Sequence, residues 1–335
     1  MNGNTITKAL TAAGFTAVAG LVTLLGATAA HASDAAGDTA AAATNNKPVA
    51  YVRAGVIYRS NGTNEIRLTE DEVNARPRFS PDGTKLAYLH NGTVWVMGAN
   101  GEDKHQVSDR IAGGASWSPD GKWIAYAALS CTGGPGVFRV GTEGGTASEP
   151  LFPASCRDQE LPQVAFAMEA PESASTPTAP AATLVDRLRT DDAVAWSPDG
   201  TKIAFRGGEC ESIADNCLSI GTVATGGERA IDVYGGGGNG TSGFGVVPAW
   251  RTDGQKVAWT SYDADGTAVA VTEADVDGAN RHAVGRADDR EMVYAGTGTG
   301  VLTAAYNGHS WITAVNLATG KRTPLHQGSQ PTVAP

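Results

Sequence analysis

The chain has 335 residues, of which 41% are hydrophobic, 18% are charged and 43 are glycine. Its 35 acidic residues outnumber its 25 Lys and Arg residues, so the formal net charge is −10 at pH 7. Nucleic-acid binding requires clustered Lys and Arg, and this charge balance argues against that class of protein. We therefore expect no nucleic-acid partner.

Residues 1–32 have the pattern of a secretory signal peptide. An uncharged run of small and apolar residues extends from Ala9 to Ala30, and an Ala-x-Ala cleavage site ends at Ala32. An uncleaved membrane anchor is the alternative, because the run is just long enough to span a bilayer. No second apolar stretch of that length follows. We expect a secreted or extracytoplasmic protein with no membrane span after cleavage, beginning with a disordered leader over residues 33–47.

A short phrase of the type aromatic–Ser-Pro-Asp-Gly recurs along the rest of the chain. Its copies are Phe79–Gly83, Trp117–Gly121, Trp196–Gly200 and the degenerate Trp250–Gly254, each followed by a strand of Ile-Ala-Tyr type. In such a turn Pro sets the first corner, Asp accepts a hydrogen bond from backbone two residues on, and Gly adopts the left-handed conformation. We therefore interpret the repeated aspartates as formers of β-hairpin turns rather than as ligands.

Recurrence with a period of about 40 residues is typical of propellers and solenoids. We divide each repeat into strands A to D, with the Asp-Gly phrase as the A–B turn. The repeats lie near residues 78–107, 114–152, 193–233, 247–285 and 290–325. The chain before them, from Val49 to Leu68, resembles strands B, C and D without an A. Because Gln330–Pro335 resembles the start of a repeat, it can supply the missing strand.

The sequence therefore predicts an all-β, six-bladed β-propeller of four-stranded antiparallel blades. The N- and C-terminal strands would close the ring in one blade, which leaves no long strand edge unpaired. We expect a single domain over residues 48–335 with an inserted loop at about 153–192. Seven blades are the alternative, because the step between Asp-Gly turns across this loop is about twice the repeat period.

The cysteines are Cys131, Cys156, Cys210 and Cys217. Export through an oxidising compartment favours disulfides over free thiols. Three pairings are possible, and local spacing favours Cys131–Cys156 with Cys210–Cys217. A zinc site would require closer cysteine spacing or histidine partners nearby, and neither is present in the sequence.

These turns with their Ile-Ala-Tyr strands, and Val94–Met97 with its Asn100-Gly101 turn, resemble the repeat of the TolB-like six-bladed β-propellers, often described as WD-repeat-like. The resemblance covers most of residues 48–335 and implies a bacterial protein–protein interaction module. Related propellers include periplasmic partner proteins, halves of prolyl-oligopeptidase-type peptidases and pectin-fragment lyases. A peptidase would need a Ser nucleophile elbow, and Gly308–Ile312 lacks the second Gly of that motif.

A weakly bound calcium ion is the alternative to a protein without a cofactor. Two Asp-x-Asp-Gly segments supply the candidate ligands Asp263, Asp265, Asp275 and Asp277. Neither segment has the later Glu that completes an EF-hand loop, and each coincides with a predicted strand turn. Of the histidines, only His90 and His309 are expected on one face, which is too few for a multi-histidine metal site.

In a propeller, the A–B and C–D turns lie on one face, here called the turn face. The B–C loops and the D–A connections between blades lie on the other, here called the loop-rich face. Both cysteine pairs, the insertion from 154 to 192 and the Gly-rich loop 235–245 belong to the loop-rich face. Elaborated loops on a rigid scaffold often carry binding. The candidate binding residues are His90, Glu211, Asp215, Asn239, Ser242, Phe244 and His309.

We expect a secreted, monomeric propeller without catalytic residues that binds a protein or cell-envelope partner through the loop-rich face. The alternative is a carbohydrate-active lyase or hydrolase with a site in the central funnel. The enzyme would be favoured if three of five residues converged at metal-binding distance. These five are His90, His309, Asp191, Asp192 and Glu211.

Overall fold

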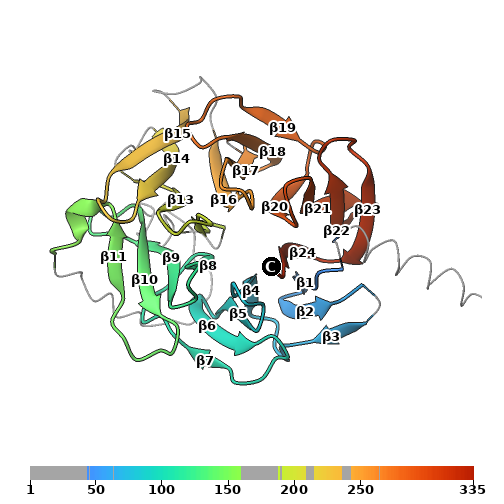
Figure 1. Ribbon diagram of the computed structural model, residues 1–335, viewed down its shortest axis with the longest axis horizontal. Coiled ribbons are helices and arrows are strands. Elements are labelled where there is room, and N and C mark those ends of the chain that lie inside the picture. Colours follow the sequence, from blue (N-terminus) through green and yellow to red (C-terminus); the bar gives the residue numbers. More distant parts are fainter. Residues whose placement is uncertain are drawn as a thin grey trace, which may run out of the picture.

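The protein is described by a computed structural model that covers residues 44, 46–62, 64–159, 188, 191–208, 215–235, 243–263 and 265–335. The regular secondary structure of these residues is β-strand, apart from one short 3-10 helix, η1 (Ala154–Cys156). The strands assemble into six sheets of four, arranged around a common axis as the blades of a ring (Figure 1). The predicted all-β, six-bladed propeller is confirmed.

The blades are numbered here in ring order, and each runs from the axis outward. Blade 1 contains β24 (Ser329–Val333), β1 (Val49–Arg53), β2 (Val56–Ser60) and β3 (Glu65–Arg67). Blade 2 contains β4 (Asn74–Phe79), β5 (Lys85–His90), β6 (Thr93–Gly98) and β7 (His105–Gln106). Blade 3 contains β8 (Ala115–Trp117), β9 (Trp123–Leu129), β10 (Pro135–Gly141) and β11 (Glu149–Phe152).

The second half of the ring repeats this order. Blade 4 contains β12 (Ala195–Trp196), β13 (Lys202–Arg206), β14 (Asp215–Thr222) and β15 (Glu228–Gly235). Blade 5 contains β16 (Phe244–Trp250), β17 (Lys256–Tyr262), β18 (Ala268–Asp275) and β19 (His282–Val284). Blade 6 contains β20 (Arg290–Tyr294), β21 (Thr299–Tyr306), β22 (His309–Asn316) and β23 (Arg322–Gln327).

The Asp-Gly phrase forms the A–B turn in the way its residues predict. In blade 2, Ser80 Oγ donates a 2.6 Å hydrogen bond to Asp82 Oδ1, which also accepts from the Thr84 amide at 3.1 Å. Gly83 has a left-handed φ of 72°. The Ser-to-Asp bond recurs with the same length in blades 3 and 4, and Arg251 replaces the serine as donor in blade 5. The interpretation of the repeated aspartates as turn-formers is thus confirmed.

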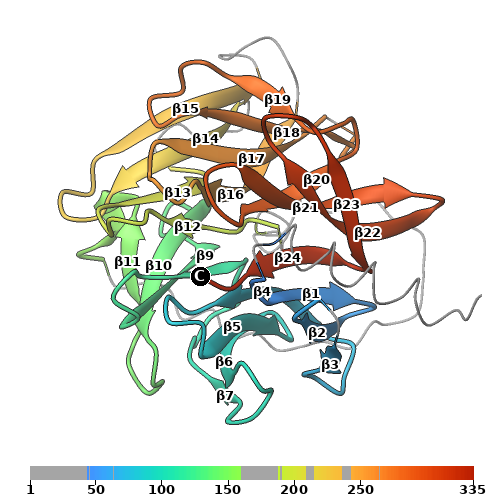
Figure 2. The same ribbon diagram turned by 45° about the vertical axis from the view of Figure 1, so that its right-hand side comes forward.

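The two ends of the chain close the ring in blade 1. Strand β24 pairs antiparallel with β1, with Val49 opposite Val333 and Ala50 opposite Thr332. In both views β24 lies on the axial side of β1, between blades 2 and 6 (Figures 1 and 2). The strand missing from the first repeat is therefore supplied by the C-terminal segment, as the sequence indicates.

Blades 3 and 4 are direct neighbours, which excludes the seven-bladed alternative. The Phe152 ring of β11 is fully buried and stacks on Phe205 of β13, with 5.2 Å between ring centroids. A common apolar cluster joins the two blades around these rings. The inserted loop at 153–192 thus contributes no blade between them, and within it the structure describes only 153–159, 188, 191 and 192.

A disulfide between Cys131 and Cys156 links the B–C loop of blade 3 to η1. Cys217 is also disulfide-bonded, whereas Cys210 lies outside the described residues. The predicted signal peptide and most of the leader lie outside them too. Nowhere in the described ranges is there a helix with the length and apolarity needed to cross a membrane.

Candidate functional site

The A strands lie nearest the ring axis (Figure 1), and four of them carry a residue that bulges out of the ladder. These residues are Arg76 in β4, Val247 in β16, Glu291 in β20 and Gln330 in β24, with φ between 52° and 59°. Pairing with strand B shifts register at each of them. A bulge re-aims the side chain at that position, and here bulge residues of different blades meet.

Arg76 of blade 2 and Glu291 of blade 6 form an ion pair across blade 1, the blade that closes the ring. Arg76 Nη1 lies 2.8 Å from Glu291 Oε1, and both side chains are less than a tenth exposed. Gln330 lies between them: its amide donates to Glu291 Oε2, and its Oε1 accepts from the Arg76 amide. Burial raises the pKa of Glu291, but the Arg76 charge and hydrogen bonds from the Thr303 hydroxyl and the Gln330 amide outweigh it and hold the pKa below its usual value.

Packed side chains occupy the ring axis at the level of the bulges. Ala193 and Val247 are each 1% exposed, and Arg76 is 3% exposed. Ala193 and Val247 belong to one apolar cluster, which Phe244 and Tyr262 extend toward the loop-rich face. These side chains are packed and buried, so candidate sites are located at the two faces of the ring.

The predicted binding residues are dispersed rather than gathered in one site. His90 ends β5, where its Nδ1 lies 3.1 Å from Asn74 Oδ1. His309 begins β22 and is exposed, opposite Tyr306 in the B–C hairpin of blade 6. Phe244 begins β16 and stacks on Tyr262 with 5.1 Å between ring centroids. Asp215 begins β14, and the remaining three, Glu211, Asn239 and Ser242, lie outside the described residues.

Metal-binding groups do not converge in the part of the chain that the structure describes. No set of three His, Cys, Asp or Glu residues there is placed to hold an ion. Asp192 is almost fully buried and pairs with Arg206 at 2.7 Å. The structure therefore does not bring together three of the residues His90, His309, Asp191 and Asp192, and Glu211 lies outside its described ranges.

The two Asp-x-Asp-Gly segments lie at opposite ends of β18, so their carboxylates cannot act together. Asp263 accepts the amides of Asp265 and Thr267 in the B–C turn. At the C–D turn, Asp277 accepts the Ala279 amide. These hydrogen bonds belong to the turns themselves.

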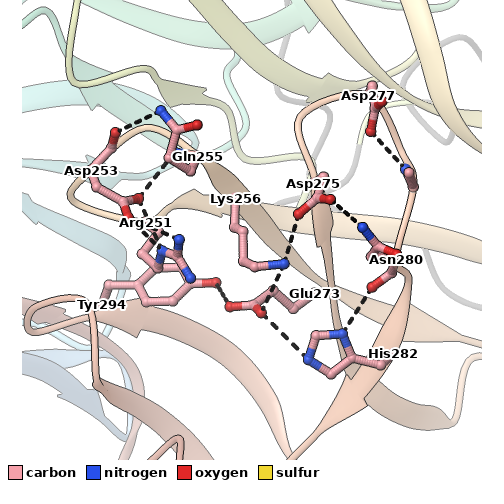
Figure 3. A network of polar contacts seen from close by, with 11 residues as sticks. Arg251, Asp253, Gln255, Lys256, Glu273, Asp275, Asp277, Asn280, His282 and Tyr294 are labelled. Atoms are coloured by element: carbon pink, nitrogen blue, oxygen red, sulfur yellow. Dashed lines mark hydrogen bonds and ion pairs between the residues drawn. The ribbon is translucent and has the colours of Figure 1, made fainter.

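Figure 3 shows that Asp275 belongs to a polar network rather than to an open carboxylate cluster. The Lys256 ammonium lies 2.7 Å from Asp275 Oδ1 and Asn280 donates to Oδ2, which together hold the pKa of Asp275 below its usual value. Alongside it, the buried Glu273 accepts a 2.7 Å hydrogen bond from the Tyr294 hydroxyl and lies 3.4 Å from His282 Nε2 (Figure 3). The network ties blade 5 to blade 6.

A cavity of about 380 Å³ between blade 6 and the D–A connection that precedes it was not expected from the sequence. Its apolar wall includes Ala304, Trp311 and Pro324, and Tyr306 stands at its edge with 64% of its surface exposed. Tyr306 immediately precedes the Asn307-Gly308 tip of a B–C hairpin, so it belongs to the loop-rich face. An aromatic residue beside an Asn-Gly tip is the signal that could have indicated it.

The polar floor of this cavity is an ion pair between the D–A connection and strand D. Both nitrogens of the Arg322 fork bind Asp289, with Nη1–Oδ2 at 2.6 Å and Nη2–Oδ1 at 2.8 Å. The Arg286 amide donates to the same carboxylate at 2.7 Å. Asp289 is 2% exposed, so its charge is satisfied inside the protein and the cavity offers mainly an apolar surface.

No protein-family model matches the sequence, and neither does any curated protein. The structure is similar to that of TolB from Acinetobacter baumannii, with a TM-score of 0.60 and 14% identity over 86% of this chain and 67% of that one. It is also similar to a putative TolB from Agrobacterium tumefaciens, with a TM-score of 0.56 and 15% identity over 84% of this chain and 90% of the other.

A third solved structure, an oligogalacturonate lyase in complex with manganese, matches with a TM-score of 0.50 and 12% identity over 85% of this chain and 75% of the lyase. These similarities establish the fold, which is that of a TolB-like six-bladed β-propeller.

Proposed function

We propose that this TolB-like propeller is an exported, non-catalytic protein that binds a protein or cell-envelope partner through its loop-rich face. The similarity to TolB propellers supports a protein-binding role. The Cys131–Cys156 disulfide supports an extracytoplasmic location, because disulfides persist in oxidising compartments.

The observation that carries the proposal is the position of Tyr306. Its ring is 64% exposed beside an apolar cavity of about 380 Å³ on the loop-rich face. Val73 and Val269, exposed by 47% and 51%, lie at the same end of the molecule, in a D–A connection and beside a B–C hairpin. Tyr306 and the apolar cavity wall beside it form one contiguous surface, which is characteristic of an interaction site.

Binding would depend on Tyr306, which a rigid hairpin would hold in place to contact the partner. Tyrosine is enriched among the residues that dominate binding energy, because it combines a large contact area with few rotatable bonds. Tyr306 projects from a hairpin whose strands pair from Thr299–Asn316 to Tyr306–His309. Few groups would have to become ordered on binding, so less conformational entropy would be lost.

The test is quantitative capture of partners from the cell envelope by the immobilised mature protein. We expect Tyr306→Ser to weaken capture of the specific partner by at least about tenfold, as a binding hot spot requires. The matched control is Ile66→Ser, because Ile66 is 43% exposed on the outer strand β3, away from the proposed surface. Equal capture by the wild type and both variants would refute the proposal.

The alternative function is that of a carbohydrate-active lyase or hydrolase, with the lyase fold similarity as its support. A metal site for such an enzyme would have to involve residues beyond those the structure describes, because no three ligands converge within the described residues. Incubation of the mature protein with pectin fragments and Mn²⁺ distinguishes the two functions. Release of unsaturated products would replace the binding proposal with the enzyme.

A further inference from the structure

A second cavity lies on the axis at the turn face, on the opposite side of the ring from the proposed binding surface. Its volume is about 290 Å³, and A strands or A–B turns of blades 2 to 6 contribute to its wall. Pro198 and Thr252, which belong to the A–B turns of blades 4 and 5, mark its outer edge. Its size approaches the range of pockets that hold a small ligand.

The charged group in the wall of this cavity is Arg78 of β4. Its Nη1 donates to the backbone carbonyls of Pro77 at 3.0 Å and Pro331 at 3.3 Å. Burial, together with the nearby Arg76 charge, lowers the pKa of Arg78 to about 10, so the guanidinium is charged at neutral pH.

Among the described residues, the half-buried Arg78 has no carboxylate at ion-pair distance, in contrast to two other half-buried arginines. Arg206 pairs with Asp192 and Arg322 with Asp289. The carboxylate whose charge acts on the pKa of Arg78 is that of Glu291. This carboxylate already pairs with Arg76. Two arginines therefore share one carboxylate near the axis, leaving an excess positive charge beside the cavity. A partly buried cation without a counter-ion among its neighbours gains stability when an anion binds.

The aromatic residues of the wall contribute apolar surface, because their polar atoms are engaged elsewhere. Trp196 Nε1 and Trp250 Nε1 donate to backbone carbonyls at 3.0 Å and 2.9 Å. The Tyr294 hydroxyl donates to Glu273. These three side chains therefore present ring carbons to the cavity, next to a guanidinium fork that matches the geometry of a carboxylate.

We propose that the Arg78 cavity binds a carboxylate carried on an apolar group, such as the C-terminal residue of a peptide or a free aromatic acid. The Arg78 guanidinium would hold the carboxylate, and the rings of Trp196, Trp250 and Tyr294 would cover the apolar part. This site is independent of the partner-binding function proposed above, because it lies on the other face.

The probes are 3-phenylpropionate and its neutral amide, titrated into the mature protein by calorimetry. We expect the acid to bind at least tenfold more tightly than the amide, because only the acid compensates the Arg78 charge. This comparison is made on the wild-type protein, so it stays decisive if a variant fails to fold. Equal affinity for acid and amide, or no binding of either at millimolar concentration, overturns the proposal.

Arg78→Gln should abolish the preference for the acid over the amide. The matched control is Arg229→Gln, because Arg229 is exposed on the outer strand β15 and should leave both affinities unchanged. Persistence of the acid preference in Arg78→Gln would place the carboxylate elsewhere and overturn the assignment to this cavity.

A second arm identifies the source of the carboxylate. A tripeptide that ends in phenylalanine is compared with its C-terminal amide and with 3-phenylpropionate. Tighter binding of the peptide acid than of 3-phenylpropionate supports a chain terminus as the ligand, and the reverse order supports a free small acid. With fluorinated tryptophan, the ¹⁹F resonances of Trp196 and Trp250 should shift with the acid and not with the amide.

Discussion

Arg76 and Glu291 belong to blades on either side of the closing blade and form a buried ion pair of 2.8 Å at the ring axis. Gln330, in the strand that closes the ring, hydrogen-bonds to both of them. The two termini are therefore held together by the β24–β1 ladder and also by a charged bridge that spans blade 1. Such a bridge opposes the opening of the ring at the blade that closes it.

Removing one partner of this bridge should destabilise the whole domain. Glu291→Gln leaves Arg76 buried without its counter-ion, and loss of one partner of a buried pair costs about 3–5 kcal/mol. The free energy of unfolding from urea titration measures this loss. The control is Glu149→Gln, because the Arg139–Glu149 pair is 30% and 52% exposed and should contribute less than about 1 kcal/mol.

A double variant distinguishes the ion pair from simple packing. Arg76→Met with Glu291→Leu removes both charges, so its loss of stability should be smaller than the sum of the two single losses. Strictly additive losses would contradict a direct interaction between Arg76 and Glu291.

The A–B turns should make stability sensitive to acid. Hydrogen bonds from Ser80 and Ser197 are the largest of the interactions that lower the pKa of Asp82 and Asp199 from 3.8 to about 2. A carboxyl group whose folded-state pKa is depressed stabilises the fold above its unfolded pKa, and loses that contribution as the pH falls toward the folded value. The loss is therefore expected between about pH 4 and pH 2.

The measurement is the melting temperature across this pH window. The double variant Asp82→Asn with Asp199→Asn should be less stable than wild type at neutral pH and should lose less on acidification. Asp265→Asn is the control, because its carboxylate accepts none of these turn hydrogen bonds. Parallel pH profiles for wild type and double variant would disprove the role of the turns.

Gly221 in β14 should not tolerate a side chain. A Cβ at this position would overlap the ring of Phe152 from blade 3, which is fully buried between the blades. Overpacking of a well-packed core costs about 1–3 kcal/mol, so Gly221→Ala should lower the free energy of unfolding by that amount. Gly298→Ala is the matched control, because nothing lies within 4 Å of its Cβ position. Equal stability of the two variants would contradict the close packing of blades 3 and 4.

Loss of the Cys131–Cys156 disulfide should destabilise the protein through its denatured state. The bond joins residues separated by 25 positions, and closing a loop of that length contributes about 3.5 kcal/mol in the chain-entropy model. The double variant Cys131→Ala with Cys156→Ala should show this loss in guanidinium unfolding, with the Cys217 disulfide left intact. A change below about 1 kcal/mol would mean that the loop is already constrained without the bond.

Much of the scaffold was predictable because its signals are local. The Ser80–Asp82 bond, the left-handed Gly83 and the reversal into β5 all occur within a few residues, so the same short phrase specifies the same turn wherever it recurs. The pairing of Cys131 with Cys156 also followed from proximity in the sequence. The number of blades could be inferred from the repeat and from the unpaired strands at the two ends.

The candidate sites were less predictable because they depend on contacts between blades. His90 and His309 were singled out by residue type, yet the exposed aromatic beside the cavity is Tyr306. The cavity beside it is formed by blade 6 and the connection that precedes that blade, so it exists only once strands β21, β22 and β23 have paired. Nothing in the local sequence around Arg78 indicates that no carboxylate of the described residues pairs with it, whereas Glu291 pairs with Arg76.

The sequence by itself determined the repeated hairpins, the ring and the strand order, because turn chemistry and strand alternation act over short distances along the chain. Only the tertiary structure decided which charges are paired at the axis and where apolar side chains remain exposed. Arg76 meets Glu291, and Arg78 faces a cavity, only once the A strands have been arranged around a common axis. Their different environments arise from ring closure, which brings together side chains from strands at opposite ends of the chain.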